Sequence, residues 1–95
     1  MLEKEIEAYL TGKVKKMGGR AYKFTSPGNS GVPDRLVMLP DGAICFVELK
    51  APGKKPSPLQ EAQMRRIRSL GQKVFVIDSK EKVDRLIERG LRTCS

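Results

Sequence analysis

The sequence has no histidine, only two cysteines and only five aromatic residues among its 95 positions. Without histidine, any general base must be a carboxylate, a lysine or a metal-bound water. The two cysteines, Cys45 in an expected strand and Cys94 near the C-terminus, make neither a disulfide framework nor a zinc site. No aromatic residue is interleaved with the basic loops, which argues against a platform for stacking single-stranded bases.

Long apolar runs are absent as well, so no segment is expected to span a membrane. The start, Met-Leu-Glu-Lys-Glu, is acidic and helix-like, which is unlike a signal peptide. A hydrophobic content of 39% over this length predicts one globular domain, residues 1–95. Together with the few cysteines, these features favour a reducing, cytoplasmic setting.

The charge balance is strongly one-sided. Nineteen basic residues stand against 11 acidic ones, which gives a net charge of +8. Lysine and arginine that neutralise phosphates release condensed counterions, so this excess favours a nucleic-acid partner over a merely soluble basic protein.

Helical and strand-like patterns alternate along the chain. Apolar residues spaced by three and four predict an amphipathic helix over residues 2–17. The further expected elements are strands at 21–25, 34–39 and 43–50, a helix from Pro58 to Leu70 capped by Ser57, a strand at 73–77, and a last helix that ends at Gly90 with Asp78 and Glu81 as its capping box. This order predicts a three-layer α/β/α fold with a mixed sheet, formed by an antiparallel meander and a right-handed crossover.

The turn between the second and third strands decides which side chains meet. Pro-Asp-Gly at 40–42 suits a three-residue hairpin loop with the glycine in the left-handed conformation. Counting outward from this loop pairs Asp34 with Glu48. A two-residue turn within the same segment would instead place Asp34 opposite Leu49 and separate the two acids.

Paired carboxylates on one face have Cβ atoms roughly 4.5–5.5 Å apart and repel each other unless a proton or a cation lies between them. Lys50 lies on the same face, about 6.7 Å further along the strand. Two acids with a lysine suit a metal-dependent phosphodiesterase, in which a hard cation activates water and the lysine orients or deprotonates that water. The plain alternative is a solvated Glu48–Lys50 ion pair. Because Ile44 and Phe46 share the face, however, part of it is expected to be buried.

These residues resemble the PD-(D/E)XK nuclease signature: Pro33-Asp34, then Val47-Glu48-Leu49-Lys50, which begins 13 residues after Asp34. More narrowly, nearly the whole chain resembles the stand-alone virus-type replication-repair nuclease (VRR-NUC) domain, through "EKEIEAYL", "SPGNSGVPDRLVML", "FVELKAPGKKPSPLQ" and "LGQKVFVIDS". The resemblance implies a restriction-endonuclease-like core. It also implies a Mg²⁺-dependent (or Mn²⁺-dependent) DNA endonuclease of phages and bacteria, similar to Holliday-junction resolvases and typically a homodimer.

The resemblance also implies roles for individual residues. Asp34 corresponds to the metal-binding aspartate, Glu48 to the second acidic ligand and Lys50 to the catalytic lysine, while the backbone carbonyl of Leu49 completes the ligand set in many relatives.

The family also has a glutamate on the first helix, and Glu3, Glu5 and Glu7 compete for this place. The apolar stripe of that helix is centred near Ile6, and at about 100° per residue Glu3 lies closest to its border. Glu3 is therefore chosen as a catalytic residue, with Glu7 in reserve. An acid that merely favours the first helical turn is the alternative for each of them.

Gln60 matches the glutamine that follows the lysine motif in this family, which makes it a further catalytic candidate. However, Ser57-x-x-Gln60 is also a capping box, in which the glutamine only returns a hydrogen bond to the backbone. Gln63, on the core-facing stripe of the same helix, is a geometric competitor.

Candidates for contacts with the DNA backbone are basic and lie around the expected site: Arg35, Lys54, Lys55, Arg65 and Arg66. Such contacts position the protein without reading sequence. The glycine-rich loop at 26–32 offers N–H groups that suit a phosphate. The resemblance implies a four-way junction as the favoured substrate. A nuclease for flaps or other branched DNA, a catalytically silent DNA-binding module and a basic protein-interaction domain are the alternatives.

Overall fold

The computed structural model of the chain describes residues 1–90, so Cys94 lies outside the described residues. Within this range the elements are α1 (Glu3–Lys16), β1 (Arg20–Lys23), β2 (Arg35–Met38), β3 (Ile44–Leu49), α2 (Pro58–Ser69), β4 (Val74–Ile77) and α3 (Lys80–Arg85), which continues as a π-helical turn, Leu86–Gly90. None of the described helices is long and apolar enough to cross a membrane.

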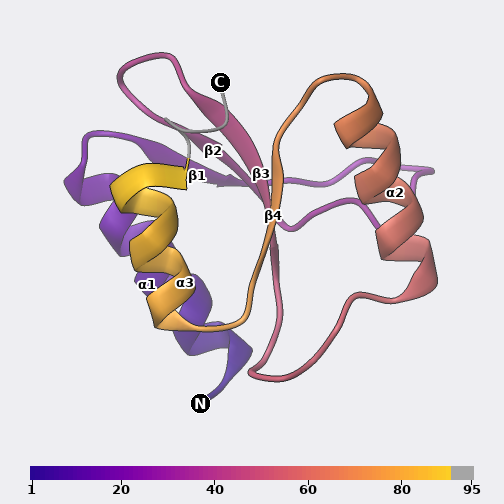
Figure 1. The fold of residues 1–95 in the computed structure, drawn as a ribbon, viewed down its shortest axis with the longest axis horizontal. Coiled ribbons are helices and arrows are strands. Elements are labelled where there is room, and N and C mark those ends of the chain that lie inside the picture. Colours follow the sequence, from indigo (N-terminus) through magenta and orange to yellow (C-terminus); the bar gives the residue numbers. More distant parts are fainter. Residues whose placement is uncertain (91–95) are drawn as a thin grey trace.

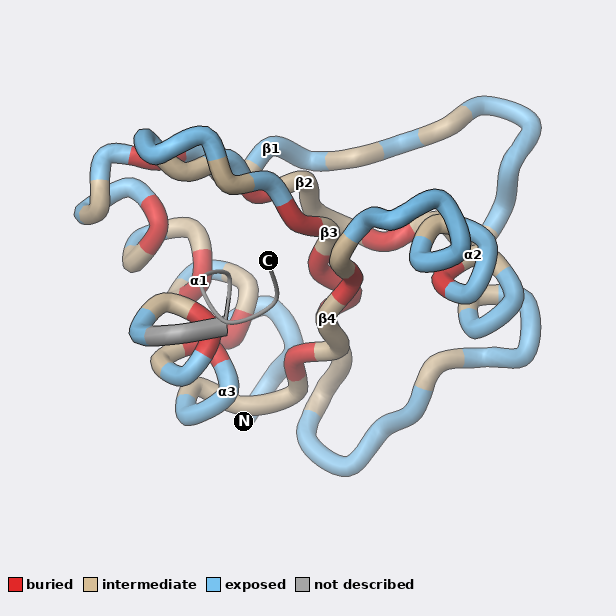
Figure 2. Tube along the Cα trace, turned by 45° about the horizontal axis from the view of Figure 1, so that its top comes forward, coloured by how far each residue is buried: buried red, intermediate tan, exposed pale blue. Residues whose placement is uncertain are grey.

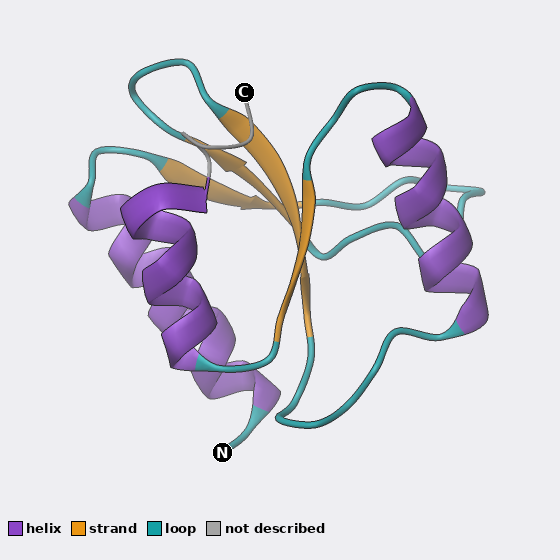
Figure 3. Cartoon of the chain, in the orientation of Figure 1, coloured by secondary structure: helices purple, strands orange, loops and turns teal. Residues whose placement is uncertain are grey.

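The four strands form one mixed sheet in the order β1-β2-β3-β4. The first three strands are antiparallel, whereas β4 is parallel to β3 and α2 makes the crossover between them. Helices α1 and α3 lie side by side on one face of the sheet and α2 lies on the other (Figure 1 and Figure 3). The predicted three-layer α/β/α fold and its element order are confirmed.

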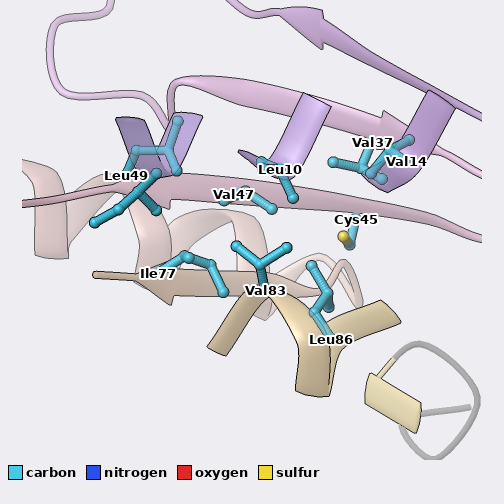
Figure 4. Close-up of a cluster of buried hydrophobic side chains, with 10 residues drawn as sticks. Leu10, Val14, Val37, Cys45, Val47, Leu49, Ile77, Val83 and Leu86 are labelled. Carbon is cyan, nitrogen blue, oxygen red and sulfur yellow. The ribbon is translucent and has the colours of Figure 1, made fainter. Parts of the chain in front are cut away.

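The hydrophobic core lies between the sheet and the α1–α3 layer (Figure 4). Because successive residues of a strand point to opposite faces, β3 contributes Cys45, Val47 and Leu49 to this core. The opposite layer is much more open, since Met64 is the only buried residue of α2. Figure 2 shows the same contrast, with α2 mostly exposed. Most of the apolar burial therefore lies on one face of the sheet.

The hairpin between β2 and β3 has the predicted three-residue loop. Gly42 has a φ of 91°, and the N–H of Leu39 donates to the carbonyl of Ala43 at 2.9 Å. In the resulting register Arg35 lies opposite Val47, so the next position outward brings residues 34 and 48 together.

The predicted cap of the last helix was wrong. Ser79, and not Asp78, is the N-cap of α3, and its hydroxyl accepts a hydrogen bond from the N–H of Lys82 at 3.1 Å. Asp78 instead accepts from the N–H of Gly53 and pairs with the side chain of Lys82. A long-range partner, the N–H of Gly53, and a lysine four residues further along the chain therefore bind this carboxylate.

Candidate functional site

The central acid of the site is Glu48, in β3. Its side chain points away from the core and toward the α2 side of the sheet. Its exposed fraction is only 1%, and Lys50 Nζ lies 3.3 Å from its Oε2 atom. Phe46, on the same face, is half-buried, whereas Ile44 is 44% exposed. This face of the sheet is thus buried at the position of Glu48. The alternative interpretation, in which Glu48 and Lys50 form an ion pair on a solvated face, therefore does not describe Glu48.

Asp34 immediately precedes β2 and reaches the same end of the sheet. Its Oδ2 atom accepts a hydrogen bond from the N–H of Leu49 at 2.8 Å, and its backbone carbonyl accepts from the N–H of Phe24 at the same distance. These two bonds fix Asp34 between β1 and β3. The turn geometry and these contacts therefore bring Asp34, Glu48 and Lys50 together.

The electrostatics of Glu48 are unusual. Burial, followed by the nearby charge of Asp34, raises its pKa from 4.5 to about 7, although hydrogen bonding and charge from Lys50 act in the opposite direction. In addition, Glu48 Oε1 is buried and has no hydrogen-bond partner among the described residues. A buried carboxylate oxygen left unpaired is costly, and a cation beside Asp34 would satisfy it.

The donor set fits a hard divalent cation. Mg²⁺ is commonly bound by one or two carboxylates, with water and substrate phosphates as its other ligands. Asp34 and Glu48 supply two carboxylates, and backbone carbonyls, such as that of Leu49, are oxygen donors of the same kind. Among the described residues no cluster of three or more acidic or cysteine side chains is arranged to hold a metal. A metal here would therefore depend on the substrate and water for its remaining ligands.

The three acids of the first helix have different surroundings. Glu7 pairs with Arg35, with 3.0 Å between the nearest charged atoms, and the Glu5 carboxylate accepts from the N–H of Leu2. Glu3 is exposed, and its charge is the last of the influences that raise the pKa of Glu48. The role of Glu3 stays a prediction.

Arg35, a predicted DNA contact, also makes several bonds within the protein. Its guanidinium donates twice to Glu7 and once, at 2.9 Å, to the carbonyl of Ala21. These bonds tie α1 to β1 and β2 and use three of the five N–H donors of Arg35. They give Arg35 a structural role, and its predicted contact with DNA stays a prediction.

The two glutamines of α2 both have protein partners. Gln60 forms the capping box: its Oε1 atom accepts from the N–H of Ser57 at 2.8 Å, and the Ser57 hydroxyl accepts from its N–H at 3.2 Å. Gln63 donates to the carbonyl of Ser30 at 3.2 Å. The capping box explains the spacing of Gln60, and its catalytic role stays a prediction.

The loop before Asp34 is held against α2. Besides the bond from Gln63, Gly31 approaches Leu59 so closely that an added Cβ would lie 3.0 Å from its side chain. Pro33, the last residue of the loop, is fully buried. Helix α2 thus supports the segment that leads into Asp34.

Of the predicted basic contacts, Lys54, Lys55 and Arg65 line one pocket, whereas Arg66 is not part of its lining. Sequence reasoning missed two further basic residues of this pocket, Arg68 and Lys82. Arg68 follows Arg65 by three residues and so lies on the same helical face, a signal that was present in the sequence.

A mixed sheet between two helical layers, with an aspartate, a glutamate and a lysine at one end of a central hairpin, defines a nuclease of the PD-(D/E)XK class. Comparison with known proteins narrows this class. No family model matches the sequence. However, 79 residues of the chain are 56% identical to "Putative nuclease p44" of Acyrthosiphon pisum secondary endosymbiont phage 1, covering 83% of this chain and 85% of the phage protein.

A solved structure described as a VRR_NUC domain superposes with a TM-score of 0.85 and 41% identity, covering 92% of this chain and 95% of that one. The chain belongs to the VRR-NUC family of nucleases, and the resemblance stated from its motifs is confirmed.

Proposed function

We propose that the chain, acting as one nuclease domain over residues 1–95, is a Mg²⁺-dependent DNA endonuclease that resolves four-way junctions as a homodimer. Its setting would be the cytoplasm of a bacterial or phage-infected cell. The observation that carries the proposal is the buried Glu48 Oε1 atom without a hydrogen-bond partner, beside Asp34 and Lys50. This arrangement is costly in a purely structural ion pair but suits a cation-dependent site.

Asp34 and Glu48 would hold the metal, with the carbonyl of Leu49 and, directly or through water, Glu3 as further oxygen donors. When bound, Mg²⁺ (or Mn²⁺) supplies charge neutralisation at the scissile phosphate and a lowered pKa for a bound water. Lys50 positions or activates the attacking water through its Nζ atom. Because its ion pair with Glu48 keeps this atom at the site, Lys50 need not be ordered by the substrate.

The substrate side of the proposal depends on charge and symmetry. The net charge of +8 favours a polyanion. A homodimer presents two identical sites across a two-fold axis, which matches the symmetry of a four-way junction. Flap or other branched DNA is the alternative substrate within the same activity.

The proposal is tested by incubating the purified protein with labelled four-way, flap and linear DNA, with and without Mg²⁺. We expect Mg²⁺-dependent cleavage, with the four-way junction preferred, and no cleavage by Asp34→Asn or Glu48→Gln. Binding of all three DNAs without cleavage in Mg²⁺ or Mn²⁺ would favour the catalytically silent module. Light scattering of the free protein tests the homodimer.

A further inference from the structure

A pocket of about 380 Å³ lies beside the candidate site, between the loop that follows β3, one face of α2 and the end of β4. Val76 and Met64 form part of its apolar wall. In the sheet Val76 pairs with Glu48 of the neighbouring strand. Paired residues of adjacent strands point to the same face and lie about 4.8 Å apart. The pocket therefore begins next to the strand position that carries the central acid of the site.

The lining of the pocket is strongly basic. It contains five cations, Lys54, Lys55, Arg65, Arg68 and Lys82, against the two acids Glu61 and Asp78. Asp78 is already neutralised, since its carboxylate lies 2.9 Å from Lys82 Nζ and also accepts from the N–H of Gly53. Four cations therefore remain against the single charge of Glu61, and such an excess in a concave site selects an anion.

The cations of α2 share one helical face. Arg65 and Arg68 follow Glu61 by four and seven residues, so all three side chains lie on the same side of the helix. The guanidinium of Arg68 donates to the carbonyl of Val74 at 2.7 Å, which holds it against β4. A guanidinium has five N–H donors, so the others stay available for a phosphate, which arginine binds in a two-pronged geometry.

We propose that this pocket binds one backbone phosphate of the DNA strand, adjacent to the phosphodiester held at Asp34 and Glu48. It would thereby set which bond of the strand is cut. The inference rests on the proposed function, since it names the substrate contact that aligns the strand in that site. Arg65, Arg68 and both lysines of the loop are exposed, so a long strand is able to enter and leave the pocket.

Binding is measured first, in EDTA so that no DNA is cleaved, by fluorescence anisotropy over a range of salt concentrations. We expect the double variant Arg65→Ala with Arg68→Ala to bind a DNA duplex about 10-fold to 100-fold more weakly, because each of two solvent-exposed contacts contributes roughly a factor of 3 to 10. The slope of log affinity against log salt should fall by about 1. The matched control, Lys15→Ala with Lys16→Ala at the end of α1, removes two charges from the opposite layer and should change affinity less than about threefold.

A second double variant, Lys54→Ala with Lys55→Ala, changes only an exposed loop and keeps the inference testable if loss of the Arg68 bond unfolds the protein. Thermal melting establishes that each variant is folded. If both folded pocket variants bind with the affinity and salt slope of the unaltered protein, the inference is wrong.

The position of the bound phosphate is then mapped with duplexes in which one phosphate at a time is a neutral methylphosphonate. We expect a methylphosphonate at one position near the cut to weaken binding by the unaltered protein about 10-fold. The same replacement should not weaken binding by the Arg65–Arg68 variant any further, because the replaced phosphate and the two arginines make the same contact. If the effects of the methylphosphonate and of the arginine substitutions add at every position, the inference is wrong. Cleavage of the DNA would still support the nuclease proposal in that case. If no DNA is cleaved but the pocket variants lose affinity and salt dependence, the nuclease proposal fails and the phosphate pocket stands.

Discussion

Replacing Glu48 with glutamine should stabilise the metal-free protein at pH 8 while abolishing its response to Mg²⁺. In the folded chain, burial and the neighbouring Asp34 raise the pKa of Glu48 from 4.5 to about 7. At a pH between these two pKa values, the folded state binds more protons than the unfolded state. The free energy of unfolding must therefore fall as the pH rises through this range. Glutamine has no proton to lose, and its variant should lack this dependence.

The magnitude follows from the size of the shift. Each pH unit between the two pKa values corresponds to about 1.4 kcal/mol, so the unaltered protein should lose about 3 kcal/mol between pH 4.5 and pH 8. At pH 8 the variant should therefore be more stable by about 2–3 kcal/mol, which for a domain of this size is roughly 10–20 °C in melting temperature. Such a gain from deleting a charge would show that the charge is maintained for function.

Few other groups titrate in this window. The chain has no histidine, so no imidazole changes its charge between pH 5 and 8. Asp78 has a pKa lowered from 3.8, chiefly by its hydrogen bond with Lys82. Its contribution to stability is lost as the pH falls below about 4, which is outside the window and opposite in sign. A decline in stability from pH 5 to 8 would thus be assigned to Glu48.

The assay is thermal or urea unfolding followed by circular dichroism at pH 5, 6, 7 and 8, first in EDTA and then with Mg²⁺. Mg²⁺ should restore stability to the unaltered protein at pH 8, because a ligand that binds only the folded state stabilises it, and should leave Glu48→Gln unchanged. Stability that stays level or rises from pH 5 to 8 in EDTA would refute the reasoning, as would a variant that is no more stable than the parent at pH 8.

Three further predictions concern residues around the two acids. Lys50→Ala should lower the rate of DNA cleavage at least about 100-fold, with junction affinity within about threefold of the unaltered protein; loss of binding alone would contradict its assigned role. Gly31→Ala and Gly28→Ala both place alanine at a positive φ, but only the Cβ at 31 would lie 3.0 Å from a side chain of α2. Unfolding experiments should therefore show that Gly31→Ala loses about 1–3 kcal/mol more free energy of unfolding than Gly28→Ala. Gly31→Ala should also cleave DNA more slowly. Gln60→Ala and Ser57→Ala each break the capping box and should each cost about 1 kcal/mol of stability, with equal cleavage rates; a much slower Gln60→Ala variant would reveal a catalytic glutamine.

The sequence was sufficient to predict the pairing of the two acids because the information is local. The loop Pro-Asp-Gly specifies its own conformation, and the strand period of two carries the register outward to Asp34 and Glu48. The amphipathic pattern likewise predicted α1, whose buried residues Ile6, Leu10 and Val14 follow the expected spacing.

Contacts between distant segments could not be predicted in this way. The bonds from Arg35 to Glu7 and Ala21 depend on how α1 lies across the sheet, which no local pattern states. Asp78 precedes α3 and has the residue type of a helix cap, yet it accepts a hydrogen bond from Gly53 in the loop after β3, a contact that depends on how the loop lies against the end of β4. The basic pocket depends in the same way on the docking of α2 against β4.

The six residues of β3 carry both the stability and the proposed chemistry of the molecule. Cys45, Val47 and Leu49 point into the core (Figure 4), while Phe46 and Glu48, which alternate with them along the strand, point to the opposite face of the sheet. A one-residue slip of this strand would exchange the two sets and bury the wrong side chains, at the cost of several core contacts. The hydrophobic core therefore fixes the register that brings Glu48 to Asp34. This coupling lets so small a protein keep a buried carboxylate in place. Packing of the apolar side chains on the other face of the same strand offsets the free-energy cost of removing Glu48 from water.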